Sequence, residues 1–214
     1  MIEFIPKILS GAKATLLIFF MTLIFSLPLG LPICFMRMSK NRFVKGIATV
    51  IISILRGTPL MLQLIVWFFG PYYIFGIRLS SDWRILSIII GFSINYAAYF
   101  AEIYRAGIES IPIGQYEAAT VLGYTKTKRF FKIIFPQMVK RVLPPVTNEV
   151  ITLIKDTSLA FVVAYAEMFT MAKQVAAAET TIVPLFVAGL FYYIFNYLVA
   201  FILEKIEKSF NYYS

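Results

Sequence analysis

Two carboxylate residues stand within an otherwise apolar stretch of the chain, at residues 142–166. Glu149 and Asp156 are seven residues apart, which places both on nearly the same face of a helix, two turns apart. Charged side chains inside a membrane span are costly and mark a substrate or ion pathway more often than they add stability. We expect Glu149 to face a central cavity and to bind the amino or guanidinium group of a cationic substrate, since a guanidinium can bond a carboxylate at two points.

The same carboxylates can instead form internal ion pairs. Glu149 would then pair with Arg56, and Asp156 with its neighbour Lys155. Arg56 lies ten residues into another apolar stretch, about 15 Å along a helix, which places it near the middle of the membrane. The sequence leaves both interpretations open, and Arg56, Glu149 and Asp156 are all candidate substrate-binding residues.

A second group of polar side chains lies in residues 85–101. Asn95 and Tyr99 are four residues apart and share a helix face, and Ser93 precedes them. Their amide and hydroxyl groups could bind the zwitterion of a small amino acid. The alternative is hydrogen bonding between helices, which Asn and Ser commonly supply in membrane bundles.

Composition indicates the scaffold that must position these residues. Of 214 residues, 60% are hydrophobic and only 14% are charged, and the mean hydropathy is +0.80. These values are typical of a polytopic membrane protein. We predict one all-α integral membrane domain over residues 1–214, with five transmembrane helices of roughly 20 residues or more. The expected spans are residues 14–36, 46–74, 85–101, 142–166 and 180–203.

Several function classes are disfavoured by what the sequence lacks. It has no P-loop motif, so we expect no ATPase activity in this chain. It has no histidine and a single cysteine, Cys34, which excludes a Cys/His metal site and an intrachain disulfide. The net charge of +9 comes from basic residues between spans, so membrane topology explains it better than binding to nucleic acid does.

The distribution of Lys and Arg predicts the orientation in the membrane. Thirteen of them lie in the loop after the first span, in residues 102–141 and in the C-terminal tail, against five in the N-terminal segment and the other two loops. The positive-inside rule therefore places the N-terminus outside, with residues 112–137 and the C-terminus in the cytoplasm.

Residues 112–137 are the longest stretch that is neither a span nor a plausible disordered linker. They predict two short helices, the first ended by a left-handed Gly123, the second capped by Thr125 and ended by Pro136. Ala118 and Ala119 leave bare backbone that another surface can approach closely. This basic segment is a candidate docking site for a soluble partner. An amphipathic helix lying on anionic lipid is the alternative.

Three motifs together resemble the permease subunits of ABC importers for polar amino acids. The first is Glu-Ala-Ala at 117–119, with Gly123 six residues after the Glu and Pro136 thirteen residues further on. The others are Arg-Gly-Thr-Pro-Leu at 56–60 and Lys-Asp-Thr-Ser-Leu at 155–159. The resemblance covers residues 53–169 and implies a type I importer fold, a bacterial-type plasma membrane location and transport of polar, cationic amino acids by alternating access.

The resemblance also implies partners. Two copies of a P-loop ATPase would bind ATP and Mg²⁺, so this chain would need no cofactor of its own. An external amino-acid-binding protein and a second permease subunit, identical or sibling, would complete the assembly in the lipid. The residues implied to contact the ATPase are Glu117, Ala118, Ala119 and Gly123, with Tyr116 and Phe130 anchoring the loop.

A secondary transporter and a membrane-embedded enzyme are the two alternatives to an ABC permease. In a secondary transporter, Glu149 or Asp156 would bind a proton or another coupling ion. The absence of an internal repeat and the large cytoplasmic loop favour the ABC permease. A membrane-embedded enzyme is disfavoured, because there is no histidine and no clustered catalytic constellation.

Overall fold

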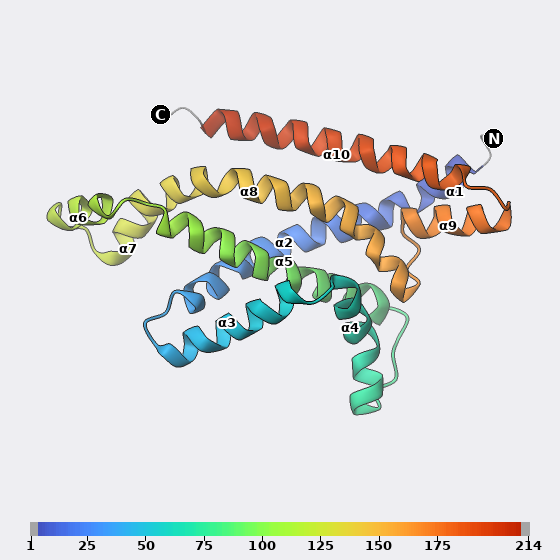
Figure 1. The fold of residues 1–214 in the computed structure, drawn as a ribbon, viewed down its shortest axis with the longest axis horizontal. Coiled ribbons are helices and arrows are strands. Elements are labelled where there is room, and N and C mark those ends of the chain that lie inside the picture. The colour runs from blue at the N-terminus through green and yellow to red at the C-terminus, as the bar shows by residue number, and fades with distance from the viewer. Residues whose placement is uncertain (1–3, 211–214) are drawn as a thin grey trace.

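The structure is a computed structural model that describes residues 4–210, so the ends of the predicted 1–214 domain lie outside the described residues. As predicted, the fold is all-α (Figure 1). A π-helical turn at Phe130–Ile134 and a 3-10 segment at Thr157–Val163 interrupt the regular helices. The α-helices are α1 (Ile5–Ser10), α2 (Ala12–Arg37), α3 (Arg42–Gly57), α4 (Leu60–Phe75), α5 (Trp83–Glu109), α6 (Ile113–Val121), α7 (Lys126–Arg129), α8 (Phe135–Asp156), α9 (Met168–Ala178) and α10 (Val183–Phe210).

Fewer helices than predicted meet the length and polarity expected of a span. Within residues 4–210 these are Ile5–Arg37, which joins α1 and α2, then α5, and Val183–Ser209 of α10. The bent pair α3 and α4 adds a fourth if it is counted as one span. Helix α8 is not among them, and it contains five charged residues, which are Lys140, Arg141, Glu149, Lys155 and Asp156. The count of five spans stays a prediction.

The ends of the helices sort into two groups. Figure 1 shows the α2–α3 connection, α6, α7 and the C-terminal end of α10 at one end of the molecule, with α1 and α9 at the other. The first group contains the segments in which Lys and Arg are concentrated. The structure therefore brings together the segments that the charge distribution assigns to the cytoplasm.

The predicted second span is broken, because Pro59 cannot continue the hydrogen bonding of α3. Helices α3 and α4 meet at 107°. In a continuous helix the carbonyl of Leu55 would accept from the N–H of residue 59, which proline lacks. Side chains replace that donor: Gln63 Nε2 donates to Leu55 O at 2.8 Å, and Asn95 Nδ2 of α5 donates to it at 2.9 Å. Asn95 Nδ2 also donates to Gln63 Oε1, at 3.0 Å.

Replacing Gln63 by leucine tests this interpretation of the break. The substitution removes one of the two side-chain donors to Leu55 O and one of the two acceptors for Asn95 Nδ2, and leucine offers no polar replacement. A lost hydrogen bond costs about 0.5–1.5 kcal/mol, so we expect a loss of roughly 1–3 kcal/mol in the free energy of unfolding. Thermal unfolding followed by the fluorescence of Trp67 and Trp83 would measure it, and an unchanged Tm would contradict the role assigned to Gln63.

Helix α5 forms the centre of the bundle and packs along much of α2. Its buried face is rich in small residues, including Ala97, Ala98 and Ala101. At Gly107 helix α8 packs so closely against α5 that an added Cβ would overlap Val142 Cγ1. Gly107 therefore fixes how near α8 lies to α5, and the groove between these two helices contains the candidate site.

We expect Gly107→Ala to destabilise the protein despite the better helix propensity of alanine, which favours the variant by roughly 1 kcal/mol. The stiff β-branched side chain of Val142 cannot turn aside easily, and overpacking of this kind costs about 1–3 kcal/mol. Thermal unfolding of the single variant and of the Gly107→Ala/Val142→Ala double variant would test this. Failure of the double variant to recover stability would show that Val142 is not the obstacle.

One predicted helix boundary is wrong. Pro136 does not end a helix but lies in the first turn of α8, after the π-helical turn. At that turn the N–H of Phe135 donates to the carbonyl of Phe130, five residues back, and the helix continues although Pro136 has no N–H. The α-helix that overlaps the span predicted for 142–166 runs from Phe135 to Asp156, and the span itself stays a prediction.

Candidate functional site

A cavity of 400 Å³ lies where α5 and α8 meet the break between α3 and α4. We call it the Asp156 cavity. It brings together Asn95, Tyr99, Glu149 and Asp156, four of the predicted substrate-binding residues. Its full lining is Thr58, Pro59, Leu60, Asn95, Tyr96, Tyr99, Glu149, Thr152, Asp156 and Leu159. Both carboxylates come from one face of α8, as the seven-residue spacing predicts.

Asp156 does not form the ion pair with Lys155 that the sequence leaves open. Its Oδ2 accepts a hydrogen bond from the hydroxyl of Tyr96 at 2.7 Å, while Lys155 is exposed. Tyr96 is buried at 2% exposure and is stacked on Phe92. Tyr96 was not among the predicted site residues, although it lies three residues before Tyr99, on a neighbouring part of the same helix face.

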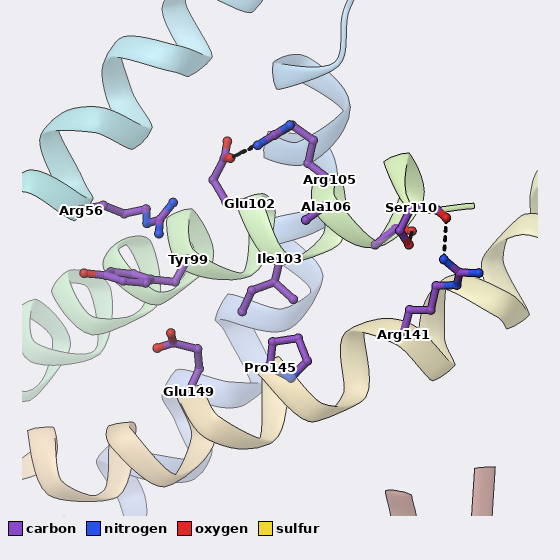
Figure 2. A pocket seen from close by; sticks show the side chains of 11 residues that line it. Arg56, Tyr99, Glu102, Ile103, Arg105, Ala106, Ser110, Arg141, Pro145 and Glu149 are labelled. Atoms are coloured by element: carbon purple, nitrogen blue, oxygen red, sulfur yellow. Dashed lines mark hydrogen bonds and ion pairs between the residues drawn. The ribbon is translucent and has the colours of Figure 1, made fainter. Parts of the chain in front are cut away.

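Glu149 likewise makes no ion pair within 4 Å among the residues that the structure describes. The guanidinium of Arg56 instead lies over the ring of Tyr99, 4.9 Å from its centre, a cation–π contact. Figure 2 shows Tyr99 between Arg56 and Glu149. The Glu149 carboxylate is half-buried and lines the cavity, and none of the basic residues within 4–210 is bonded to it.

The other two polar candidates on α5 differ in position. Asn95 lines the cavity, but its amide donates to Leu55 O and Gln63 Oε1, so the alternative of interhelical hydrogen bonding accounts for this amide. Ser93 is buried without a hydrogen-bond partner in the described part of the chain, and it does not line the cavity.

A second cavity, of 440 Å³, adjoins the first, because Tyr99 and Glu149 line both (Figure 2). We call it the Arg141 cavity. It follows the groove between α5 and α8 toward the end of the molecule that holds α6 and α7. Its lining is Arg56, Tyr99, Glu102, Ile103, Arg105, Ala106, Gly107, Ser110, Arg141, Pro145 and Glu149. The predicted residue Arg56 lies here.

The α6–α7 region presents part of the predicted docking surface. Glu117, Ala118 and Gly123 are exposed, and Gly123 has a φ of 71°, as the predicted left-handed turn requires. The Thr125 side chain accepts from Lys128 N, which confirms the predicted cap. Ala119 is different, because it is fully buried and cannot form a surface contact.

The predicted anchors of this region make the expected kind of contact. The Tyr116 hydroxyl donates to Ile108 O of α5 at 3.4 Å, and Phe130 packs edge-on against Phe35 of α2 at 5.5 Å between ring centres. Burial raises the pKa of the Tyr116 hydroxyl. Arg129 Nη1 also donates to Thr120 Oγ1, at 2.9 Å, and ties α7 to α6.

Two exposed apolar residues beside Gly123 were not among the residues predicted to contact the ATPase. Val121 and Leu122 are 87% and 70% exposed and stand beside Gly123. Exposed apolar side chains in a basic, polar region indicate a contact surface. Their signal in the sequence is a Val-Leu pair directly before the turn glycine.

Comparison with known proteins identifies the family. The profile of the family described as "Binding-protein-dependent transport system inner membrane component" matches residues 23–212. The chain belongs to this family. Among the permease's curated relatives, a putative glutamine transport system permease protein of Rickettsia felis is 36% identical over 214 residues, covering 98% of this chain and 96% of the relative. The arginine transport system permease protein ArtQ of Bacillus subtilis is also 36% identical, covering 96% of this chain and 93% of ArtQ.

Solved structures agree with this assignment. The permease superposes with a TM-score of 0.88 on a chain of an amino acid ABC transporter crystallised with histidines, at 30% identity, covering 98% of this chain and 96% of that one. A chain of the MetNI methionine ABC transporter, in an inward-facing conformation, gives a TM-score of 0.79 at 17% identity. The second match supports the fold alone.

Proposed function

We propose that this permease forms the translocation path of an ATP-driven importer for polar, cationic amino acids. Membership of the family and the names of the relatives support the amino acid importer. The cationic preference is supported by one structural observation, the Asp156 cavity. Its lining includes two carboxylates, Glu149 and Asp156, and no Lys or Arg. A site with this charge favours a cationic ligand over a neutral one.

Each lining group has a role in this proposal. Glu149 binds the ammonium or guanidinium of the substrate side chain, and Asp156, held in place by the Tyr96 hydroxyl, binds a second cationic group such as the α-ammonium. Asn95 holds the helix break that forms one wall. Tyr99 contributes an aromatic face, on which Arg56 already rests.

Energy for transport would come from two copies of a P-loop ATPase that bind ATP and Mg²⁺ and dock on the exposed surface of α6. Glu117, Ala118, Val121, Leu122 and Gly123 form that surface. A second permease subunit, identical or sibling, would complete the path, and an external binding protein would deliver the amino acid. The N-terminus would lie outside and the C-terminus in the cytoplasm.

Reconstitution tests the proposal and separates it from ion-coupled secondary transport. The permease, its ATPase and its binding protein would be placed in proteoliposomes with radiolabelled arginine. We expect uptake that requires ATP inside and survives dissipation of ion gradients by ionophores. Uptake that proceeds without ATP and stops with an ionophore would instead support a secondary transporter, with Glu149 or Asp156 as its ion site.

A further inference from the structure

The Arg141 cavity differs in charge from the Asp156 cavity beside it. Carboxylates are the only charged groups lining the Asp156 cavity, whereas three arginines and two glutamates line the Arg141 cavity. Tyr99 and Glu149 are common to both linings. An amino acid passing along the groove therefore leaves a carboxylate-lined site, passes Glu149 and reaches a region with a surplus of guanidinium groups.

Part of this charge is already neutralised within the protein. Glu102 accepts from Arg105 at 2.7 Å and pairs with Arg37 of α2 at 3.2 Å. Arg105 also pairs with Glu109 at 2.6 Å. These residues form a network joining α2 to α5, in which each of the three guanidinium nitrogens of Arg105 donates to a carboxylate.

Arg141 is outside that network. Within residues 4–210 its guanidinium has no carboxylate within 4 Å, and its Nη1 donates to the backbone carbonyl of Ser110 at the end of α5. A carbonyl accepts a hydrogen bond but does not neutralise the charge, and a guanidinium has five N–H donors. Arg141 thus retains both charge and donors for an anionic group in the cavity.

The space between Arg141 and Glu149 suits an aliphatic chain. The two residues are eight positions apart on α8, about 12 Å along the axis, and both side chains reach into the cavity. Figure 2 shows Ile103 and Pro145 between them. The arrangement is a carboxylate at one end, an apolar middle and a guanidinium at the other.

We propose that the Arg141 cavity is a second amino acid site, distinct from the Asp156 cavity, for an amino acid with a long cationic side chain. The substrate carboxylate binds Arg141, its methylene groups lie on Ile103 and Pro145, and its side-chain cation stays on Glu149. Because Glu149 lines both cavities, the side-chain cation of the substrate stays bound to Glu149 while the substrate carboxylate moves to Arg141. This inference rests on the proposed function and adds a step on the cytoplasmic side of it.

Equilibrium titration of the purified permease–ATPase complex with L-arginine tests the proposal. Because both sites use Glu149, we expect one molecule per permease chain at a time, bound about tenfold more weakly in Arg141→Gln, with Arg141→Lys restoring most of the affinity. Agmatine, which is arginine without its carboxylate, should bind equally well in every variant. Glutamine at 141 can still donate to Ser110 O, so the end of α5 keeps a cap while the charge is lost. Lys45→Gln, an equal charge loss at an exposed position lining neither cavity, should bind arginine as the wild type does.

Arginine binding that responds to Asp156→Asn but not to Arg141→Gln would overturn the second site and leave the proposed function intact. Complete absence of arginine binding would overturn both. If Arg141→Gln lowers the Tm and reduces arginine and agmatine binding equally, Arg141 is only a cap for α5 and the proposal fails. Weaker binding of arginine, with unchanged binding of agmatine and an unchanged Tm, supports it.

Discussion

Glu149→Gln is expected to lower uptake of arginine by about 10- to 100-fold while leaving assembly with the ATPase intact. Hydrogen bonds to a charged group contribute about 1.5–3 kcal/mol, and glutamine keeps the shape of the side chain but not its charge. The effect should be large because Glu149 lines both cavities and no basic residue bonds it within the described part of the chain. Initial rates in proteoliposomes would measure the change.

A neutral substrate and a remote variant provide the controls for that experiment. Uptake of glutamine, if the permease carries it, should fall by less than about threefold, because Glu149 is assigned to the side-chain cation. Glu179→Gln removes the same charge from an exposed position at the end of α9 and should behave as the wild type. Unchanged arginine uptake in Glu149→Gln would contradict the assignment of Glu149 to the substrate.

Gly123→Val is expected to abolish recovery of the ATPase with the tagged permease and to reduce ATP-dependent uptake to background. At a φ of 71° a β-branched residue is strongly disfavoured, because even an ordinary side chain costs about 1–2 kcal/mol in this region. The turn would rearrange and shift Val121 and Leu122, the most exposed apolar residues beside it. Co-purification from native membranes would measure the loss.

Two further variants separate docking from folding. Gly46→Val adds the same side chain to a helical glycine of α3 with open space around its Cβ position, and it should retain the ATPase. Val121→Asp leaves the turn geometry alone but places a charge on the proposed contact surface, and it should lose the ATPase. Recovery of the ATPase with both Gly123→Val and Val121→Asp would exclude this surface as the docking site.

Features set by local chemistry could be predicted from the sequence. The long charge-free stretches predicted helices of the bundle. The left-handed conformation of Gly123 and the cap at Thr125 follow from conformational preferences that need no tertiary information. The common face of Glu149 and Asp156 follows from helix periodicity alone. Each of these depends only on residues a few positions apart.

Features that depend on the arrangement of helices could not be predicted in this way. The pairing of Asp156 with Tyr96 and the rest position of Arg56 on Tyr99 require α8, α5 and α3 to be placed relative to one another. The burial of Ala119 depends on which side of α6 faces the rest of the loop. The prediction that a helix ends at Pro136 failed because the helix continues through a π-helical turn, which has no clear sequence signature.

Helix α8 connects the α6–α7 region to both cavities as one element. It starts directly after the π-helical turn and runs 22 residues to Asp156, about 33 Å, with Arg141 and Glu149 along its length. A tilt of a helix of this length by about 10° around one end moves its other end by about 6 Å. Pro144 and Pro145 lie inside α8, between Arg141 and Glu149, and remove two backbone donors there. We therefore expect a displacement of α6 and α7 to reach the space around Asp156 through α8, with the proline pair as the point at which the helix can bend.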